Sequence, residues 1–302
     1  MPLTAAPVFI QKGRTLSVTA GKYGFVFDRT SGLPVSLTVS GRELFRKAPA
    51  VTLWRAPTDN DMYTRKLWEE DFLPTARLYP ESDGIEVRDR KIVYTVEGQI
   101  ANKSRLPWFK VSLVYTLSEN GMEIKTYAQR NVSLLTCAED GNKKRYTDRV
   151  PRFGFAFSLD KSLNRLFYFG NGPYECYTDF CAQSMPGWWE STVEGEYRNY
   201  LRPQEQGNHT EVRYLTLSDG ETVLKAESER MEFSALPYSI RDLDAAEHPF
   251  ELPPPSSAEL LICYKNNGIG TGSCGPVLSE KYRFSDREFT FAFTLSAEEK
   301  EK

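Results

Sequence analysis

Residues 108–117 read WFKVSLVYTL, and residues 289–295 read FTFAFTL. In both stretches large apolar residues alternate with polar or small ones, instead of recurring at the three- and four-residue spacing of a helix. The same period of two appears in residues 22–28 (KYGFVFD) and 91–100 (KIVYTVEGQI). Strands that bury one face show this pattern. The sequence therefore predicts an all-β chain, folded as a large antiparallel sandwich.

Turn-forming dipeptides separate the strand-like runs. Glycine adopts the positive φ values that tight hairpins need, and the pairs are Ser31-Gly32, Ser40-Gly41, Asn120-Gly121 and Asp219-Gly220. The Asn-Gly pair gives the strongest hairpin prediction. Only residues 65–72 and 240–247 predict short helices. Residues 168–206, which combine Gly, Pro and aromatic residues, predict long irregular loops carried by the sandwich.

One domain is expected over residues 1–302. The most polar stretch, around residues 138–148, has strand-like runs on both sides and so does not indicate a domain boundary. The last residues, 296–302 (SAEEKEK), predict a solvated charged tail.

Composition excludes several classes of function. A net charge of -3 and a pI near 5.7 give no broad positive field for nucleic acid. No apolar run reaches membrane-spanning length, and the N-terminus has no secretory signal pattern. The five cysteines, an odd number without paired CxxC spacing, indicate free thiols rather than disulfides or a zinc site: Cys137, Cys176, Cys181, Cys263 and Cys274. The expected location is the cytoplasm.

Residues 53–62 (LWRAPTDNDM) place three polar residues directly after an apolar strand and a proline. Asp59, Asn60 and Asp61 could form a metal or sugar site. The favoured interpretation is structural: their side chains bond nearby backbone amides and cap the following helix, while Arg55 pairs with a carboxylate.

Two further segments carry acidic residues next to rigid or small ones. Retaining glycosidases need two carboxyl groups about 5 to 5.5 Å apart, a geometry that spacing in an irregular loop does not provide, so the first segment is interpreted as a structural loop. In the second segment a catalytic base with a partner residue is conceivable. Residues 168–180 contain Gly170, Gly172 and Pro173 ahead of Glu175 and Asp179, and residues 200–215 contain Pro203, Gln204, Glu205, Gln206 and Gly207 ahead of His209. A lone histidine beside a turn is more often structural than a catalytic base.

The glycines of residues 266–276 (NNGIGTGSCGP) are a weak indication of a phosphate loop, because Pro276 and a strand-like run follow where a helix would be required. Cys274 in this loop has no obvious neighbouring base. The residues alone indicate no metal site and no catalytic residue on this chain.

Five motifs in order resemble the C-terminal domain of glycoside hydrolase family 2 β-galactosidases, also found as the small subunit of heteromeric lactobacillar enzymes. The motifs are WRAPTDND (54–61), FGNGPYECYTD (169–179), YLRPQEQGNHTEVR (200–213), SALPYS (234–239) and GIGTGSCGP (268–276). The resemblance covers nearly the whole chain. It implies a β-supersandwich related to galactose mutarotase, and a part in hydrolysing lactose and other β-galactosides.

The resemblance also implies where the chemistry lies. In the family, the catalytic glutamates and the magnesium and sodium sites belong to a central barrel that these residues do not include. The expected partner is therefore a β-galactosidase large chain or catalytic barrel domain, the expected ligand is a galactoside substrate, and the isolated chain is expected to be inactive and to bind no cofactor itself.

The family's C-terminal domain supplies one wall of the substrate pocket, and the resemblance assigns that wall to two places. Ser273 and Cys274 stand in the loop where the best-known enzyme offers a stacking tryptophan. Phe72 and Leu73 stand near the glycine of a mobile loop that closes over galactose, so the loop's switching is not expected here. Cys176 and Gln206 are further departures, at positions where the family often has asparagine.

Two alternatives use the same superfold. The chain could be a free-standing carbohydrate-binding module, with residues such as Trp188 and Trp189 as sugar platforms. It could also be an aldose epimerase that uses its two histidines, His209 and His248.

Overall fold

The computed structural model describes residues 6–131 and 150–299. Cys137 and the polar stretch 138–148 lie outside these residues. The first strands are β1 (Val8–Lys12), β2 (Thr15–Ala20), β3 (Tyr23–Asp28), β4 (Leu33–Val39), β5 (Arg42–Glu43), β6 (Phe45–Thr52), β7 (Arg77–Arg88), β8 (Lys91–Ala101), β9 (Pro107–Ser118) and β10 (Gly121–Arg130). The later strands are β11 (Arg152–Asp160), β12 (Arg165–Gly172), β13 (Met185–Thr192), β14 (His209–Ser218), β15 (Thr222–Leu236), β16 (Ser257–Asn266) and β17 (Glu288–Glu299).

Helices are short and lie between strands. They are α1 (Met62–Glu70), α3 (Val193–Glu196) and α4 (Ile240–Ala245), with single 3-10 turns η1 (Asp59–Asp61), η2 (Leu73–Thr75), η3 (Pro249–Glu251) and η4 (Glu280–Tyr282). Among the described residues, no helix has the length and apolarity that a bilayer crossing requires.

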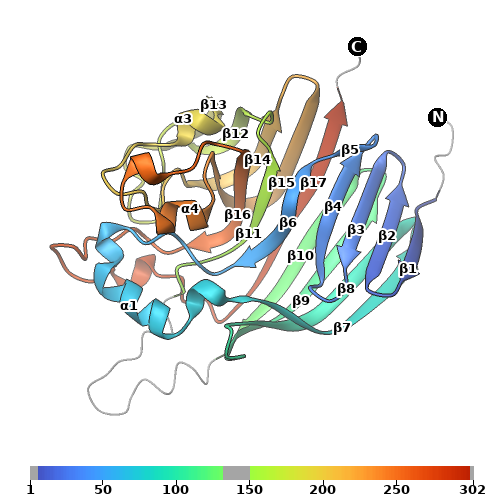
Figure 1. Cartoon of the computed structure of the whole chain (residues 1–302), viewed down its shortest axis with the longest axis horizontal. Coiled ribbons are helices and arrows are strands. Elements are labelled where there is room, and N and C mark those ends of the chain that lie inside the picture. The colour runs from blue at the N-terminus through green and yellow to red at the C-terminus, as the bar shows by residue number, and fades with distance from the viewer. Residues whose placement is uncertain (1–5, 132–149, 300–302) are drawn as a thin grey trace.

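The strands form two antiparallel sheets. A five-stranded sheet runs in chain order from β1 to β5, and a twelve-stranded sheet runs β13-β12-β14-β15-β17-β10-β9-β8-β7. From the larger sheet a branch continues from β15 to β16, β11 and β6. Figure 1 shows the smaller sheet lying across β7 to β10. The predicted all-β antiparallel sandwich is confirmed.

Aromatic side chains hold the two sheets together. The ring of Phe27 from β3 packs edge-on against Tyr94 of β8 and Tyr115 of β9, with centroid distances of 5.1 and 4.9 Å. All three side chains are fully buried. The Tyr115 hydroxyl donates to the Gly32 carbonyl at 3.0 Å, which satisfies its polar atom inside the core.

The predicted turns lie at the ends of paired strands. Ser118 pairs with Gly121, so β9 and β10 are joined by a two-residue hairpin loop. The loop residues are Glu119 and Asn120, one position earlier than the Asn-Gly pair predicts, because Gly121 already belongs to β10. The other dipeptides separate β3 from β4, β4 from β5, and β14 from β15.

The helix predictions are close to the observed helices. α4 begins at Ile240, as predicted, because Ser239 accepts a bond from the Asp242 amide and Asp242 accepts one from the Ser239 amide. It ends at Ala245, two residues early. α1 begins three residues before the predicted start at Arg65 and ends at Glu70, since Phe72 has a left-handed backbone with φ of 54°.

Two expectations are wrong in part. Residues 168–206 are not one irregular insertion, because they contain the end of β12 and all of β13. These two strands pair with each other, from Arg165 opposite Thr192 to Gly172 opposite Met185. The charged tail does not begin at residue 296, because β17 continues to Glu299. Ala297 is buried there and exchanges two hydrogen bonds of 2.9 Å with the Tyr23 hydroxyl.

Candidate functional site

Four of the motifs meet at one end of the sandwich, at the left of Figure 1. We call this surface the motif end; it comprises η1, α1 and the loops 173–184, 200–208 and 267–283. Asn60 donates to the Gly270 carbonyl at 2.8 Å, and the Glu205 amide donates to the Ala56 carbonyl at 3.0 Å. Segments more than two hundred residues apart in the chain therefore form one surface.

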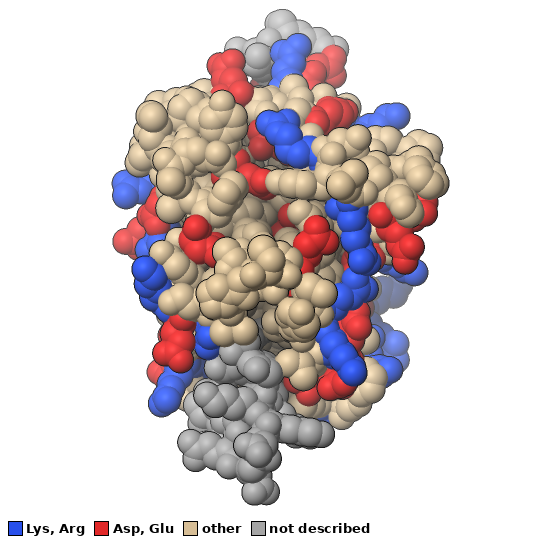
Figure 2. All heavy atoms as spheres, turned by 90° about the vertical axis from the view of Figure 1, so that its left-hand side faces the viewer, with Lys and Arg blue, Asp and Glu red and all other residues tan. Residues whose placement is uncertain are grey.

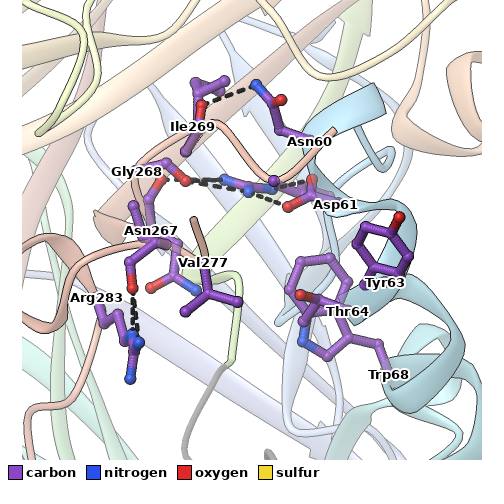
Figure 3. Close-up of a pocket in the computed structure, with 14 residues that line it drawn as sticks. Asn60, Asp61, Tyr63, Thr64, Trp68, Asn267, Gly268, Ile269, Val277 and Arg283 are labelled. Carbon is purple, nitrogen blue, oxygen red and sulfur yellow. Dashed lines mark hydrogen bonds and ion pairs between the residues drawn. The ribbon is translucent and has the colours of Figure 1, made fainter. Parts of the chain in front are cut away.

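The Arg55 guanidinium is the centre of the motif end. It is buried and makes a two-pronged ion pair with Asp61, with N–O distances of 2.6 and 3.1 Å. It also donates to the carbonyls of Asn267 and Gly268 at 3.0 to 3.2 Å. Figure 3 shows Asp61 of η1 beside Asn267 and Gly268 of the loop that follows β16. The predicted pairing of Arg55 with a carboxylate is confirmed.

The neighbouring polar residues also have structural partners. The Asp61 carboxylate accepts from the Thr58 amide at 2.9 Å and so caps the 3-10 turn rather than α1. Asn60 bonds the 268–276 loop, whereas Asp59 is exposed and its amide donates to the Gln204 side chain at 3.4 Å. This arrangement favours the structural interpretation of the TDND motif.

The carboxylates of the second motif accept hydrogen bonds from segments of the third and fifth motifs. Glu175 accepts from the Tyr200 hydroxyl at 2.5 Å and from the Gly207 amide at 2.8 Å. Asp179 accepts from the amides of Ile269 and Gly270 at 2.8 and 2.7 Å. Each carboxylate therefore fixes the backbone of another loop.

Glu205 is buried and pairs with Arg152 of β11, and the Tyr177 hydroxyl donates to it at 3.4 Å. Pro203, next to Gln204, is also buried, and the buried Gln206 side chain accepts from the Arg198 amide. The predicted Pro-Gln-Glu-Gln segment is thus anchored along its whole length.

Gly170 and Gly172 allow close packing between strands. A side chain at Gly170 would come within 2.6 Å of Val212, and one at Gly172 within 2.3 Å of the Tyr168 hydroxyl. Pro173 follows Gly172 at the end of β12 through a cis peptide bond. These residues shape the strand end rather than a ligand site.

The residues expected to line a pocket lie in two places. Ser273 donates from its amide and hydroxyl to Asn60 Oδ1 at 3.2 and 2.7 Å, and Cys274 beside it is exposed. Phe72 is 39% exposed, with the Lys103 ammonium 3.9 Å from its ring centre. Leu73 is fully buried and presents no surface to a ligand.

A cavity of about 40 Å³ lies between α1 and the 268–276 loop, lined by Arg55, Tyr63, Thr64, Trp68 and Val277 among others (Figure 3). This volume counts only the positions open to the centre of a water molecule, for which one water needs about 10–15 Å³. The cavity therefore has room for a few water molecules.

Both histidines have carboxylate partners. His209 is fully buried, with Glu196 2.8 Å from Nε2 and the Tyr168 hydroxyl 3.0 Å from Nδ1. His248 is on the surface beside Glu251. The buried ring of His209 has no contact with solvent, so it offers no surface to a sugar.

Sequence reasoning missed a buried network around Glu232. Its Oε2 accepts from the side chains of Asn208 and Asn266 at 3.0 and 2.7 Å, and from the Asn266 amide at 3.2 Å. Burial raises the pKa of Glu232 to about 7, although these donors oppose the shift. Only strand pairing brings these three residues together, and no spacing in the sequence indicates it.

Comparison with known proteins finds relatives over most of the chain. The family model described as "Beta galactosidase small chain" matches residues 19–295. A β-galactosidase from Actinobacillus pleuropneumoniae is 27% identical over 93% of this chain and 26% of its own length. One from Lactobacillus delbrueckii subsp. bulgaricus is 29% identical over 82% and 23%. The chain thus spans about a quarter of these relatives.

Among solved structures, a galactose mutarotase-like protein from Clostridium acetobutylicum is 9% identical, with a TM-score of 0.48. The superposition covers 98% of this chain and 99% of that one.

Arg55→Met is expected to lower the free energy of unfolding by about 3–5 kcal/mol, because it leaves Asp61 buried without its cation. Denaturant unfolding measures the loss. Asp59→Ala, at the exposed neighbouring position, is the control and should change stability by less than about 0.5 kcal/mol. A loss below about 1 kcal/mol for the Arg55 variant would contradict the central role of the guanidinium.

Glu232→Gln is expected to flatten the pH dependence of stability. A carboxyl group whose pKa rises from 4.5 to about 7 on folding destabilises the fold as pH increases through that range, by roughly 3 kcal/mol in total. The neutral glutamine side chain does not ionise, so the variant should not lose stability in this way as pH rises. Unfolding measured at pH 5, 6, 7 and 8 should show the difference, with the exposed Glu229→Gln as control. Equal slopes for the Glu232 variant and the unchanged protein would disprove this origin.

Proposed function

The chain belongs to the beta-galactosidase small chain family, and from this premise we propose that it is the non-catalytic small subunit, or C-terminal domain, of a retaining β-galactosidase. It completes an enzyme that hydrolyses lactose and other β-galactosides. The observation that carries the proposal is the family match over most of this chain together with its coverage of only a quarter of the relatives.

The acidic residues of the motifs support catalysis elsewhere. A retaining glycosidase needs one carboxyl group free to act as acid and a second free to attack the sugar. Here Asp61, Glu175 and Glu205 are each bonded to a guanidinium, a hydroxyl or a backbone amide of this chain. The catalytic glutamates, magnesium and sodium of the enzyme are assigned to the barrel-bearing partner.

Docking is assigned to the motif end. Figure 2 views this end, and uncharged side chains cover much of it. Large apolar side chains are exposed there: Met62, Tyr63, Tyr174, Phe180, Leu201 and Val277. A soluble protein seldom gathers such residues on one surface unless a partner covers them.

Part of the proposed wall of the sugar pocket lies on the motif end, where the exposed Ser273 bonds Asn60 and the neighbouring Cys274 is exposed. Phe72, which follows α1, presents part of its ring. These three are proposed to border the galactoside on the partner, whereas Leu73, the first residue of η2, is buried. The complex is placed in the cytoplasm, which suits the free Cys176, Cys181, Cys263 and Cys274.

Reconstitution tests the proposal. The purified chain should not hydrolyse nitrophenyl β-galactoside, and the barrel-bearing β-galactosidase chain of the same organism should gain activity when this chain is added. Hydrolysis by this chain alone, at a rate that persists through repeated purification, would overturn the proposal.

Tyr63→Asp should weaken the assembly by at least tenfold, because it places a charge within the apolar docking surface. Val87→Asp is the matched control: Val87 is 65% exposed but lies at the far end of β7. Equal weakening by both substitutions would show that docking does not use the motif end.

A further inference from the structure

On the outer face of the larger sheet, the exposed Trp188 packs against three aromatic side chains. Trp188 of β13 is 58% exposed. Its ring is nearly parallel to Phe167, at 5.1 Å between centroids and 10°, and also contacts Phe169 at 5.0 Å and Tyr214 at 5.6 Å. Three neighbouring rings therefore fix the indole while much of its surface stays in solvent.

Trp189 does not share this role. Successive residues of a strand point to opposite faces of the sheet, and Trp189 packs against the core and donates to the Gly170 carbonyl at 3.1 Å. Of the two tryptophans named as possible sugar platforms, Trp188 is exposed, whereas Trp189 is partly buried against the core.

Strand pairing leads from Trp188 to a wide polar cleft. Directly paired residues share a face, and one row runs across five strands: Trp188, Phe169, Tyr214, Glu227 and Thr294. At about 4.8 Å between neighbouring strands, the row is about 19 Å long. Its last two residues line a cleft of about 1040 Å³.

The cleft lies where β15 changes partner. β15 pairs with β17 as far as Glu227 and with β16 from Glu232 onward. The cleft is lined by acidic and basic side chains in close succession, among them Glu123, Lys125, Glu211, Arg213, Glu229, Arg230 and Lys265. These groups can both donate and accept hydrogen bonds along its length.

We propose that this row is a binding site for an oligosaccharide of pyranose units, separate from the motif end. One pyranose ring stacks its C–H face on Trp188, because the negative face of the indole attracts those weakly positive hydrogens. The following units extend past Tyr214 into the cleft, where their hydroxyls bond the charged side chains.

A sugar fits this surface better than a protein partner does. Protein interfaces have an apolar centre with few charges. Here Trp188 is the one well-exposed ring of the row, and the adjacent row of paired residues on the same face includes polar side chains. Glu190 and Thr216 flank Phe167 in the strand pairing, and Lys225 pairs with Thr216. A chain of hydroxylated rings matches one aromatic platform followed by a polar cleft.

Calorimetric titration of the full chain tests the site, with β-1,4-galactotetraose, cellotetraose and galactose as probes. At least one tetrasaccharide should bind at least tenfold more tightly than galactose, and Trp188→Ala should weaken that binding at least tenfold. Glu227→Ala should weaken the tetrasaccharide but not galactose, because the monosaccharide does not reach the cleft.

Phe250→Ala is the control, since Phe250 is 83% exposed in η3, outside the row. The affinity of this variant for the tetrasaccharide should stay within twofold of that of the unchanged protein. Thermal unfolding checks that each variant is folded. Lack of saturable binding by either tetrasaccharide, or unchanged affinity in Trp188→Ala, would overturn the proposal. So would a Trp188→Ala variant that loses only self-association or assembly with the catalytic chain. None of these results bears on whether the motif end docks the catalytic chain.

Discussion

The motif end depends on one buried cation, the guanidinium of Arg55. It connects the turn before α1, through Asp61, to the backbone that follows β16, through the carbonyls of Asn267 and Gly268. A charge this deeply buried is stable only when its partners stay in place. The segments that would face a partner are therefore fixed relative to one another before any partner binds.

The sequence predicts the fold well because strand periodicity and turn residues are local properties. It predicts the pairing of Arg55 with a carboxylate for the same reason, since Asp61 is only six residues away. It fails where distant strands decide the outcome. The sequence predicts that Trp188 belongs to a loop, whereas in the structure it pairs with Phe169 and belongs to a strand. Glu232 contacts its asparagine partners only because distant strands pair in the sheet.

Several acidic residues of the motifs fix the backbone of neighbouring segments. Glu175 and Asp179 accept backbone amides from other loops, so the motifs that suggest glycosidase chemistry instead build a rigid surface. That surface exposes several large apolar side chains beside a small cavity. The outer face of the sheet, with Trp188 and its polar cleft, has a different character. The two surfaces are proposed to bind different ligands: a protein partner at one end and a carbohydrate on the sheet.

The central claim is that the catalytic residues of the proposed enzyme lie outside the residues of this chain. A retaining glycosidase forms a covalent bond between the sugar and its nucleophile, and a 2-deoxy-2-fluorogalactoside that reacts but hydrolyses slowly traps that bond. Mass spectrometry of the separated chains then locates the label. We predict that the label is found on the barrel-bearing chain. The 302-residue chain described here should keep its unmodified mass. A label on any aspartate or glutamate of this chain would contradict the account.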